Sequence, residues 1–169
     1  MKVLFLDHDG VICLATEWGG RVKVNEGLDS VFDQFNAGAI KVLNEIISAT
    51  DCEIVVSSDW KFNATLEEMQ QLYTNRGIIK EPIDFTGTLC VGLRMSDLEL
   101  NRQAEIKKWL SEHPEVKKWV AVDDLDMSNE YISKNHGTDG LTNFVHTPRQ
   151  REGIKQTGKK KKIIGFLNQ

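Results

Sequence analysis

The amino-acid sequence predicts an α/β fold: a doubly wound parallel sheet of about five strands with helices on both faces. Short apolar runs such as residues 3–6 show no polar alternation, which is typical of strands buried on both faces of a parallel sheet. These runs alternate along the chain with segments of helical periodicity, as in a doubly wound fold. Acids and hydroxyls follow three of the runs, at the sheet edge where such folds bind ligands.

The five strands are predicted, in chain order, at residues 3–6, 53–56, 84–89, 119–122 and 143–146. Helices are predicted at residues 37–47, at 65–77, in a segment ending before Pro114, and at 159–167. Thr65 and Glu68 have the spacing of a capping box, so we expect a helix to begin there and to stop near Gly77. The helix before Pro114 has two candidate caps, Ser96 and Asn101.

Residues 13–35 interrupt this alternation between the first strand and the first helix. Residues 18–21 (Trp-Gly-Gly-Arg) offer a tight turn, and residues 21–24 (Arg-Val-Lys-Val) alternate as a short strand does. We therefore predict a β-hairpin flap over the carboxyl end of the first strand. Residues 10–57 leave no room for a large cap domain, because the first helix uses much of that span, and residues 58–101 hold no more than a helix, a strand and loops. The flap is therefore expected to be a minimal cap.

Length and composition limit the classes of protein. The chain has 169 residues, 40% of them hydrophobic, so a single domain over residues 1–169 is expected. No apolar run approaches the ~20 residues that span a bilayer, and the N-terminal run is too short for a signal peptide. Cys13, Cys52 and Cys90 match no zinc pattern and are typical of reduced thiols. The expected location is the cytoplasm.

Polar side chains follow three of the predicted strands. Asp7 and Asp9 follow the first strand, Ser57 the second, and Asp123 and Asp124 the fourth. Carboxylates gathered at one sheet edge repel each other and favour protonation unless a cation lies among them. Oxygen ligands without a Cys or His cluster suit Mg²⁺, so the sequence predicts a magnesium site.

The first of these motifs suggests covalent chemistry. Asp7 and Asp9 are two residues apart and would share a face of a regular strand, while Gly10 lets the chain turn sharply. One carboxylate can attack an electrophile such as phosphorus while the other moves a proton. His8 should point to the opposite face, where core packing is its expected role.

Taken together, these motifs resemble the haloacid dehalogenase (HAD) superfamily of phosphatases. Its first motif, an apolar strand followed by D-x-D-G-[TV], is met by residues 3–11 (Val-Leu-Phe-Leu-Asp-His-Asp-Gly-Val). Its second, a strand ending in Ser or Thr, is met by residues 54–57, and its acidic pair by residues 120–124. The third motif is a Lys or Arg ahead of the fourth strand.

Looser patterns resemble one branch of the superfamily. Residues 57–61 (Ser-Ser-Asp-Trp-Lys), and 102–106 (Arg-Gln-Ala-Glu-Ile) with Trp109 and Leu110, look like the HAD domains associated with RNA-repair proteins. The same patterns also resemble the phosphatase domain of polynucleotide kinase-phosphatase.

The resemblance implies catalytic roles for four residues. Asp7 would attack phosphorus and become an aspartyl phosphate, and Asp9 would act as general acid and then general base. Ser57 would donate a hydrogen bond to a phosphoryl oxygen, and Arg102 would neutralise the phosphate. The resemblance also implies that Mg²⁺ is bound by Asp7, Asp123 and the backbone carbonyl of Asp9, with Asp124 completing the site.

Several assignments have alternatives. Ser58 is a second candidate for the phosphate-binding hydroxyl. The phosphate-binding cation is Arg102 or, alternatively, Lys107, Lys108 or Arg94. Lys61 and Trp60 are candidate substrate contacts, although a Trp at this position more often packs beneath the loop. Asp126 is expected to be a cap or turn residue.

The predicted function is Mg²⁺-dependent hydrolysis of a phosphomonoester. In the superfamily that the chain resembles, a minimal cap leaves the site open and goes with bulky substrates, so the resemblance favours a nucleic acid 3′-phosphate. Residues 149–169 carry seven basic side chains and one acidic one, in a chain of net charge −4, which would suit a polyanion. The alternative substrate is a nucleotide or sugar phosphate. A receiver-type phosphoacceptor is disfavoured by the motif order, and a non-catalytic HAD fold by the presence of both Asp7 and Asp9.

Overall fold

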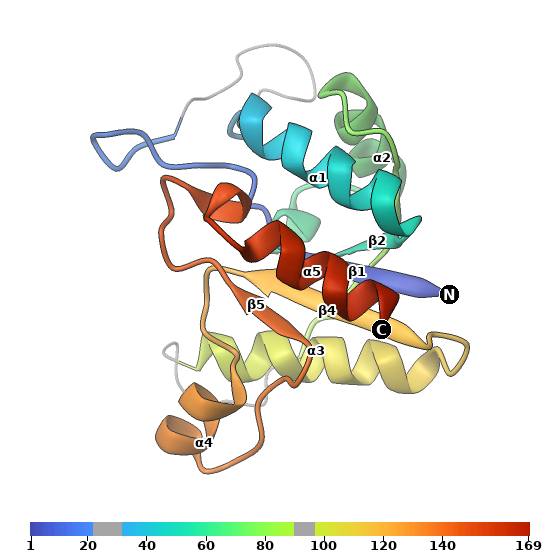
Figure 1. The fold of residues 1–169 in the computed structure, drawn as a ribbon, viewed down its shortest axis with the longest axis vertical. Helices are drawn as coiled ribbons and strands as arrows, with labels where there is room; N and C mark the ends of the chain where they lie inside the picture. Colours follow the sequence, from blue (N-terminus) through green and yellow to red (C-terminus); the bar gives the residue numbers. More distant parts are fainter. Residues whose placement is uncertain (22–31, 90–96) are drawn as a thin grey trace.

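The computed structural model describes residues 1–21, 32–89 and 97–169, and it confirms the predicted α/β fold (Figure 1). One five-stranded parallel sheet has the order β3-β2-β1-β4-β5. Its strands are β1 (Lys2–Leu6), β2 (Glu53–Val56), β3 (Pro82–Phe85), β4 (Lys118–Asp123) and β5 (Phe144–His146). The α-helices are α1 (Ala37–Thr50), α2 (Leu66–Asn75), α3 (Leu98–Glu112), α4 (Asn129–His136) and α5 (Lys159–Asn168). The 3₁₀ helices among the described residues are η2 (Asp59–Phe62) and η3 (Gly153–Lys155).

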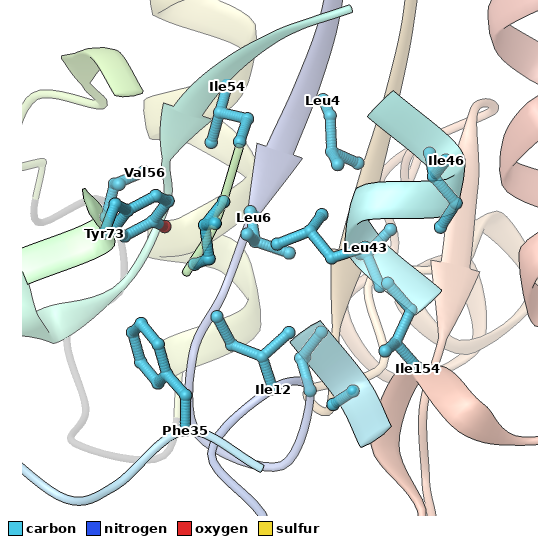
Figure 2. Packing of buried hydrophobic residues seen from close by; sticks show 14 of the residues in the cluster. Leu4, Leu6, Ile12, Phe35, Leu43, Ile46, Ile54, Val56, Tyr73 and Ile154 are labelled. Carbon is cyan, nitrogen blue, oxygen red and sulfur yellow. The ribbon is translucent and has the colours of Figure 1, made fainter. Parts of the chain in front are cut away.

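Successive strand residues enter two different cores. Leu4 and Leu6 of β1 pack in a core with α1, α2 and α5, whereas Val3 and Phe5 pack on the other face against α3. Figure 2 shows part of the first core, including Leu4, Leu6 and Leu43. Fully burying an aliphatic side chain of this size stabilises the fold by roughly 1.5–3 kcal/mol. Because strand side chains alternate, odd-numbered residues of β1 face α3 and even-numbered ones face α1.

The bounds of β3 and the start of α3 differ from the sequence-based expectation. β3 begins at Pro82 and ends at Phe85, earlier than the predicted 84–89. As an edge strand it tolerates Pro82, which cannot donate to the ladder, and the Thr86 amide just beyond its end still donates to the Val56 carbonyl of β2 at 3.0 Å. α3 begins at Leu98, between the two candidate caps; its N-cap is Asp97, and Ser96 lies outside the described residues.

The sequence analysis did not predict α4. Its N-cap is Ser128, whose hydroxyl accepts from the Tyr131 amide, and Gly137 ends it with φ +68°. These signals are present in the sequence, but Ile132 is the only buried side chain of the helix. The apolar periodicity that identifies longer helices is therefore missing.

Only part of the predicted flap lies among the described residues. The turn is present: the Gly19 amide donates to the Thr16 carbonyl at 3.1 Å, with Gly19 at φ +79°. Trp18 is exposed at this turn. The alternating residues 22–24 lie outside the described part of the chain. Among the described residues, no helix is both long and apolar enough to cross a membrane.

The capping box predicted at α2 is confirmed and leads to a stability prediction. The Thr65 hydroxyl accepts from the Glu68 amide at 3.2 Å, and the Glu68 carboxylate accepts from the Thr65 amide at 2.9 Å. We expect Thr65→Ala to lower the free energy of unfolding by about 1 kcal/mol, measured by urea denaturation. Thr65→Ser keeps the hydroxyl and should lose much less; equal losses in the two variants would contradict the capping role.

Candidate functional site

The strand register brings three predicted site residues together at the carboxyl edge of the sheet. Asp7 directly follows β1; its amide donates to Val122 of β4 at 3.1 Å, and the Ser57 amide donates to Leu6 of β1 at 2.9 Å. Asp123 ends β4, the neighbouring strand. Asp7, Ser57 and Asp123 all have the odd numbering that faces α3, the helix that carries Arg102.

Arg102 lies in the middle of this group and is only 8% exposed. One nitrogen, Nη1, is 3.2 Å from Asp7 Oδ1 and 3.2 Å from Asp123 Oδ2, and it also donates to the backbone carbonyl of Ser57. The other, Nη2, donates to Asp59 Oδ1 at 2.9 Å. The planar guanidinium can reach several carboxylates at once because its donors form a fixed fork.

The other candidate cations lie elsewhere. Lys107 donates to the backbone carbonyl of Asp139 at 2.7 Å, and Lys108 pairs with Glu112 along the exposed face of α3. Arg94 lies outside the described residues. Among the candidates that the structure describes, Arg102 is therefore the one beside the carboxylates.

Burial disfavours the ionised form of the carboxyl groups in this cluster. It raises the pKa of Asp7 from 3.8 to about 6, against the opposing effect of the Arg102 charge. Burial, together with the charge of Asp7, also raises the pKa of Asp123 well above its ordinary value. A single guanidinium therefore does not fully neutralise the group, and a further cation would be favoured there.

Three carboxylates are arranged to hold such a cation. Oxygen atoms of Asp7, Asp123 and Asp124 all lie within 4.8 Å of one another. Hard oxygen donors of this kind fit Mg²⁺, which is bound through one or two carboxylates and keeps several waters. Of the predicted metal ligands, Asp9 is the one whose carboxylate lies outside this group, so it could contribute only through its backbone carbonyl.

Asp124 is held in place by neighbouring loops. Its Oδ2 accepts from Gln150 at 2.7 Å, and its backbone carbonyl is 2.9 Å from His146 Nε2. Gly10 passes directly beside it: a Cβ at this glycine would lie 2.5 Å from Asp124 Oδ2, and its φ of +71° also disfavours a side chain. Gly10 of the first motif thus leaves space for the carboxylate of Asp124 in the acidic pair.

The two candidate hydroxyls have different surroundings. The Ser57 hydroxyl is buried and has no hydrogen-bond partner within the described part of the chain. The Ser58 side chain hydrogen-bonds Asp7, which lowers the pKa of that carboxyl. Ser57 therefore has its donor available for a ligand, and Ser58 is already used to hold Asp7.

Lys61 does not point toward the carboxylate cluster. Its Nζ is 2.7 Å from Glu105 Oε2 of α3, in an ion pair whose side chains are both more than nine-tenths buried, and it also donates to the Gly87 carbonyl at 2.9 Å. Breaking a buried ion pair costs about 3–5 kcal/mol. Lys61 is therefore poorly placed for the substrate contact suggested from the sequence.

His8 lies in an aromatic cluster on the opposite face, as predicted from strand alternation. Its Nε2 is 2.7 Å from the Tyr73 hydroxyl, and its ring packs against Trp60 and Phe35. Burial, with the nearby charges of Arg76 and Arg102, lowers the pKa of His8 to about 3. The ring is therefore neutral at physiological pH and serves packing.

Trp60 also packs inside this cluster, beneath the loop that follows β2. It is 7% exposed and donates its indole N–H to Asp9 Oδ2 at 3.2 Å. On the other oxygen of Asp9, Arg21 Nε lies 3.3 Å away. The sequence analysis did not anticipate these contacts or the parts played by Asp59 and Gln150. Asp59 could have been suspected because it directly follows Ser57 and Ser58.

The raised pKa of Asp7 predicts how the metal-free protein responds to pH. The folded state binds this proton more tightly than the unfolded chain, so the group contributes stability that is fully present below pH about 4 and is lost as the pH rises through about 6. In excess chelator, the unfolding free energy of the parent relative to Asp7→Asn should therefore fall between pH 4 and 7. A difference that is flat or rises with pH would contradict the burial argument.

Comparison with known families agrees with this geometry. Residues 3–157 match the model of a family described as "HAD domain in Swiss Army Knife RNA repair proteins". Searches of curated proteins and of solved structures give no match. The matched region contains the whole sheet apart from Lys2, the first residue of β1, and the whole of the carboxylate cluster. The chain therefore belongs to the family of HAD domains found in Swiss Army Knife RNA repair proteins.

Proposed function

We propose that the protein is a Mg²⁺-dependent phosphomonoester hydrolase that works through an aspartyl phosphate. The observation that carries this proposal is the arrangement of Asp7, Asp123 and Arg102 at the carboxyl edge of the sheet, in a chain of the HAD family. A carboxylate beside a buried cation is suited to attack on a phosphoryl group, whose negative charge must be neutralised as it transfers.

In the first step, Asp7 attacks phosphorus while the bond from phosphorus to the leaving oxygen breaks. Asp9 gives its proton to that oxygen, which departs as an alcohol. In the second step, Asp9 takes a proton from water, and the resulting hydroxide attacks the phosphorus of the aspartyl phosphate. Inorganic phosphate leaves and the Asp7 carboxylate is restored.

Other residues support these steps. The free Ser57 hydroxyl would donate to a phosphoryl oxygen, and Arg102 would neutralise the transferring group. Asp7, Asp123, Asp124 and the Asp9 carbonyl would hold Mg²⁺. When bound, this ion offsets charge on the phosphoryl oxygens and on the clustered carboxylates.

For the substrate we propose a nucleic acid 3′-phosphate. The family's description connects its members with RNA repair. A second support is α5, whose first turn consists of four lysines, residues 159–162, with Arg149 and Lys155 exposed nearby. Cations at a helix N-terminus oppose the helix dipole, so they cost stability here and suit an anionic ligand. Lys160 has a protein partner, Glu45, at 2.8 Å.

Metal dependence gives a direct test of the carboxylate site. We expect turnover of p-nitrophenyl phosphate with Mg²⁺, none in excess chelator, and inhibition by Ca²⁺. Calcium takes more ligands at longer distances and would disturb the in-line geometry. The check is a steady-state assay against a metal titration; undiminished turnover in chelator would refute the metal site.

Substrate class is tested by phosphate release from matched oligonucleotides. We expect release from a 3′-phosphorylated strand to exceed that from the 5′-phosphorylated strand and from mononucleotides. Asp7→Asn should lower turnover of every substrate at least about 100-fold, because its amide is a poor nucleophile, while the melting profile stays cooperative. Faster release from mononucleotides would favour the small-molecule alternative, and an active Asp7→Asn would refute the covalent route.

A further inference from the structure

The Asp9 side chain must be oriented correctly if it is to pass a proton. It lies where the chain leaves β1, before the turn at Gly10, and its side chain is about 40% exposed. Surrounding backbone alone does not fix such a carboxyl group. Within the described part of the chain, two side chains contact its oxygens: Trp60 through a directed hydrogen bond at 3.2 Å, and Arg21 through an ion pair at 3.3 Å.

Trp60 is the more rigid of these two partners. Its ring stacks on Phe32, with centroids 4.6 Å apart and planes at 17°, and on Phe35 at 5.3 Å and 18°. His8 meets it edge to face at 4.7 Å. Such aromatic contacts each add roughly 0.5–1.5 kcal/mol beyond burial, so the direction of the indole N–H is well fixed.

We propose that Trp60 is the positioning residue for Asp9, an inference that rests on the proposed phosphatase function. An indole N–H donates and cannot accept a hydrogen bond. It therefore holds Asp9 Oδ2 without taking up the acid proton. The other oxygen, Oδ1, is buried beside Arg21 Nε, so the proton to be transferred is carried by Oδ2, which can accept the indole N–H and still donate its own proton. In the transfer, the Asp9 O–H bond breaks as an O–H bond forms on the leaving oxygen.

This role makes a prediction that depends on the leaving group. Benzyl phosphate releases a strongly basic alkoxide and needs the proton as the ester bond breaks. p-Nitrophenyl phosphate releases a weakly basic phenolate and needs it little. Loss of Asp9 positioning should therefore reduce kcat/KM for the benzyl ester selectively, since kcat/KM reports steps up to departure of the leaving group. A loss of overall stability or of the metal site would reduce kcat/KM for the two esters by the same factor.

The experiment compares Trp60→Phe with the parent on both esters, with saturating Mg²⁺. This variant removes the N–H but keeps an aromatic ring against Phe32 and Phe35. We expect kcat/KM for benzyl phosphate to fall about tenfold, a part of the 10²–10⁴-fold that general acid catalysis contributes, and that for p-nitrophenyl phosphate to fall less than about twofold. Thr65→Ala, which removes a helix cap but contacts neither Trp60 nor Asp9, is the control for lost stability and should change the two esters by equal factors.

Two further measurements make the outcome decisive. Replacing Trp60 with 3-benzothienylalanine keeps the ring shape without the N–H, and it should reproduce the selective loss even if Trp60→Phe is poorly folded. In an Asp9→Asn background, Trp60→Phe should have no additional effect on the benzyl ester, because the two residues act as one unit. Equal losses on both esters, or an additive effect with Asp9→Asn, would overturn the positioning role. A parent protein that hydrolyses neither ester would instead overturn the proposed phosphatase function itself.

Discussion

The site depends on the buried contact of Arg102 with Asp7 and Asp123. Two carboxylates in a dry setting cannot both stay ionised without a cation, because an unpaired buried charge is strongly disfavoured. The guanidinium reduces this penalty without removing it, as the raised pKa values of both acids indicate. The structure therefore combines a partly neutralised acidic cluster with a carboxyl group, Asp7, that can lose its proton near neutral pH. This balance is compatible with the roles proposed for Asp7 as nucleophile and metal ligand.

The two-residue period of a strand explains which groups meet. Asp7, Ser57 and Asp123 continue the odd-numbered faces of β1, β2 and β4, and these faces are covered by α3. A single side chain of that helix, Arg102, therefore contacts all three residues. His8, one residue along, enters the opposite core and joins an aromatic cluster instead. A shift of register by one residue would exchange these environments.

The sequence allowed prediction of features that depend on local patterns. The buried strands β1, β2, β4 and β5, the capping box at Thr65 and the acids after β1 and β4 are all encoded within a few neighbouring residues. Features that depend on distant partners were missed. Lys61 adjoins the second motif and was expected to contact substrate, but Glu105, 44 residues further along the chain, pairs with it. α4 escaped prediction because it buries a single side chain.

The buried Lys61–Glu105 pair ties η2 to α3, one helical turn after Arg102. Arg102 of α3 contacts Asp7 from one face of the sheet, whereas Trp60, in the aromatic cluster on the other face, contacts Asp9. Lys61 follows Trp60 in the chain, so its ion pair with Glu105 connects the two layers. We therefore expect residues 61 and 105 to change together in evolution, as a charge-matched pair, whereas residues that pack in only one of the two layers should vary independently.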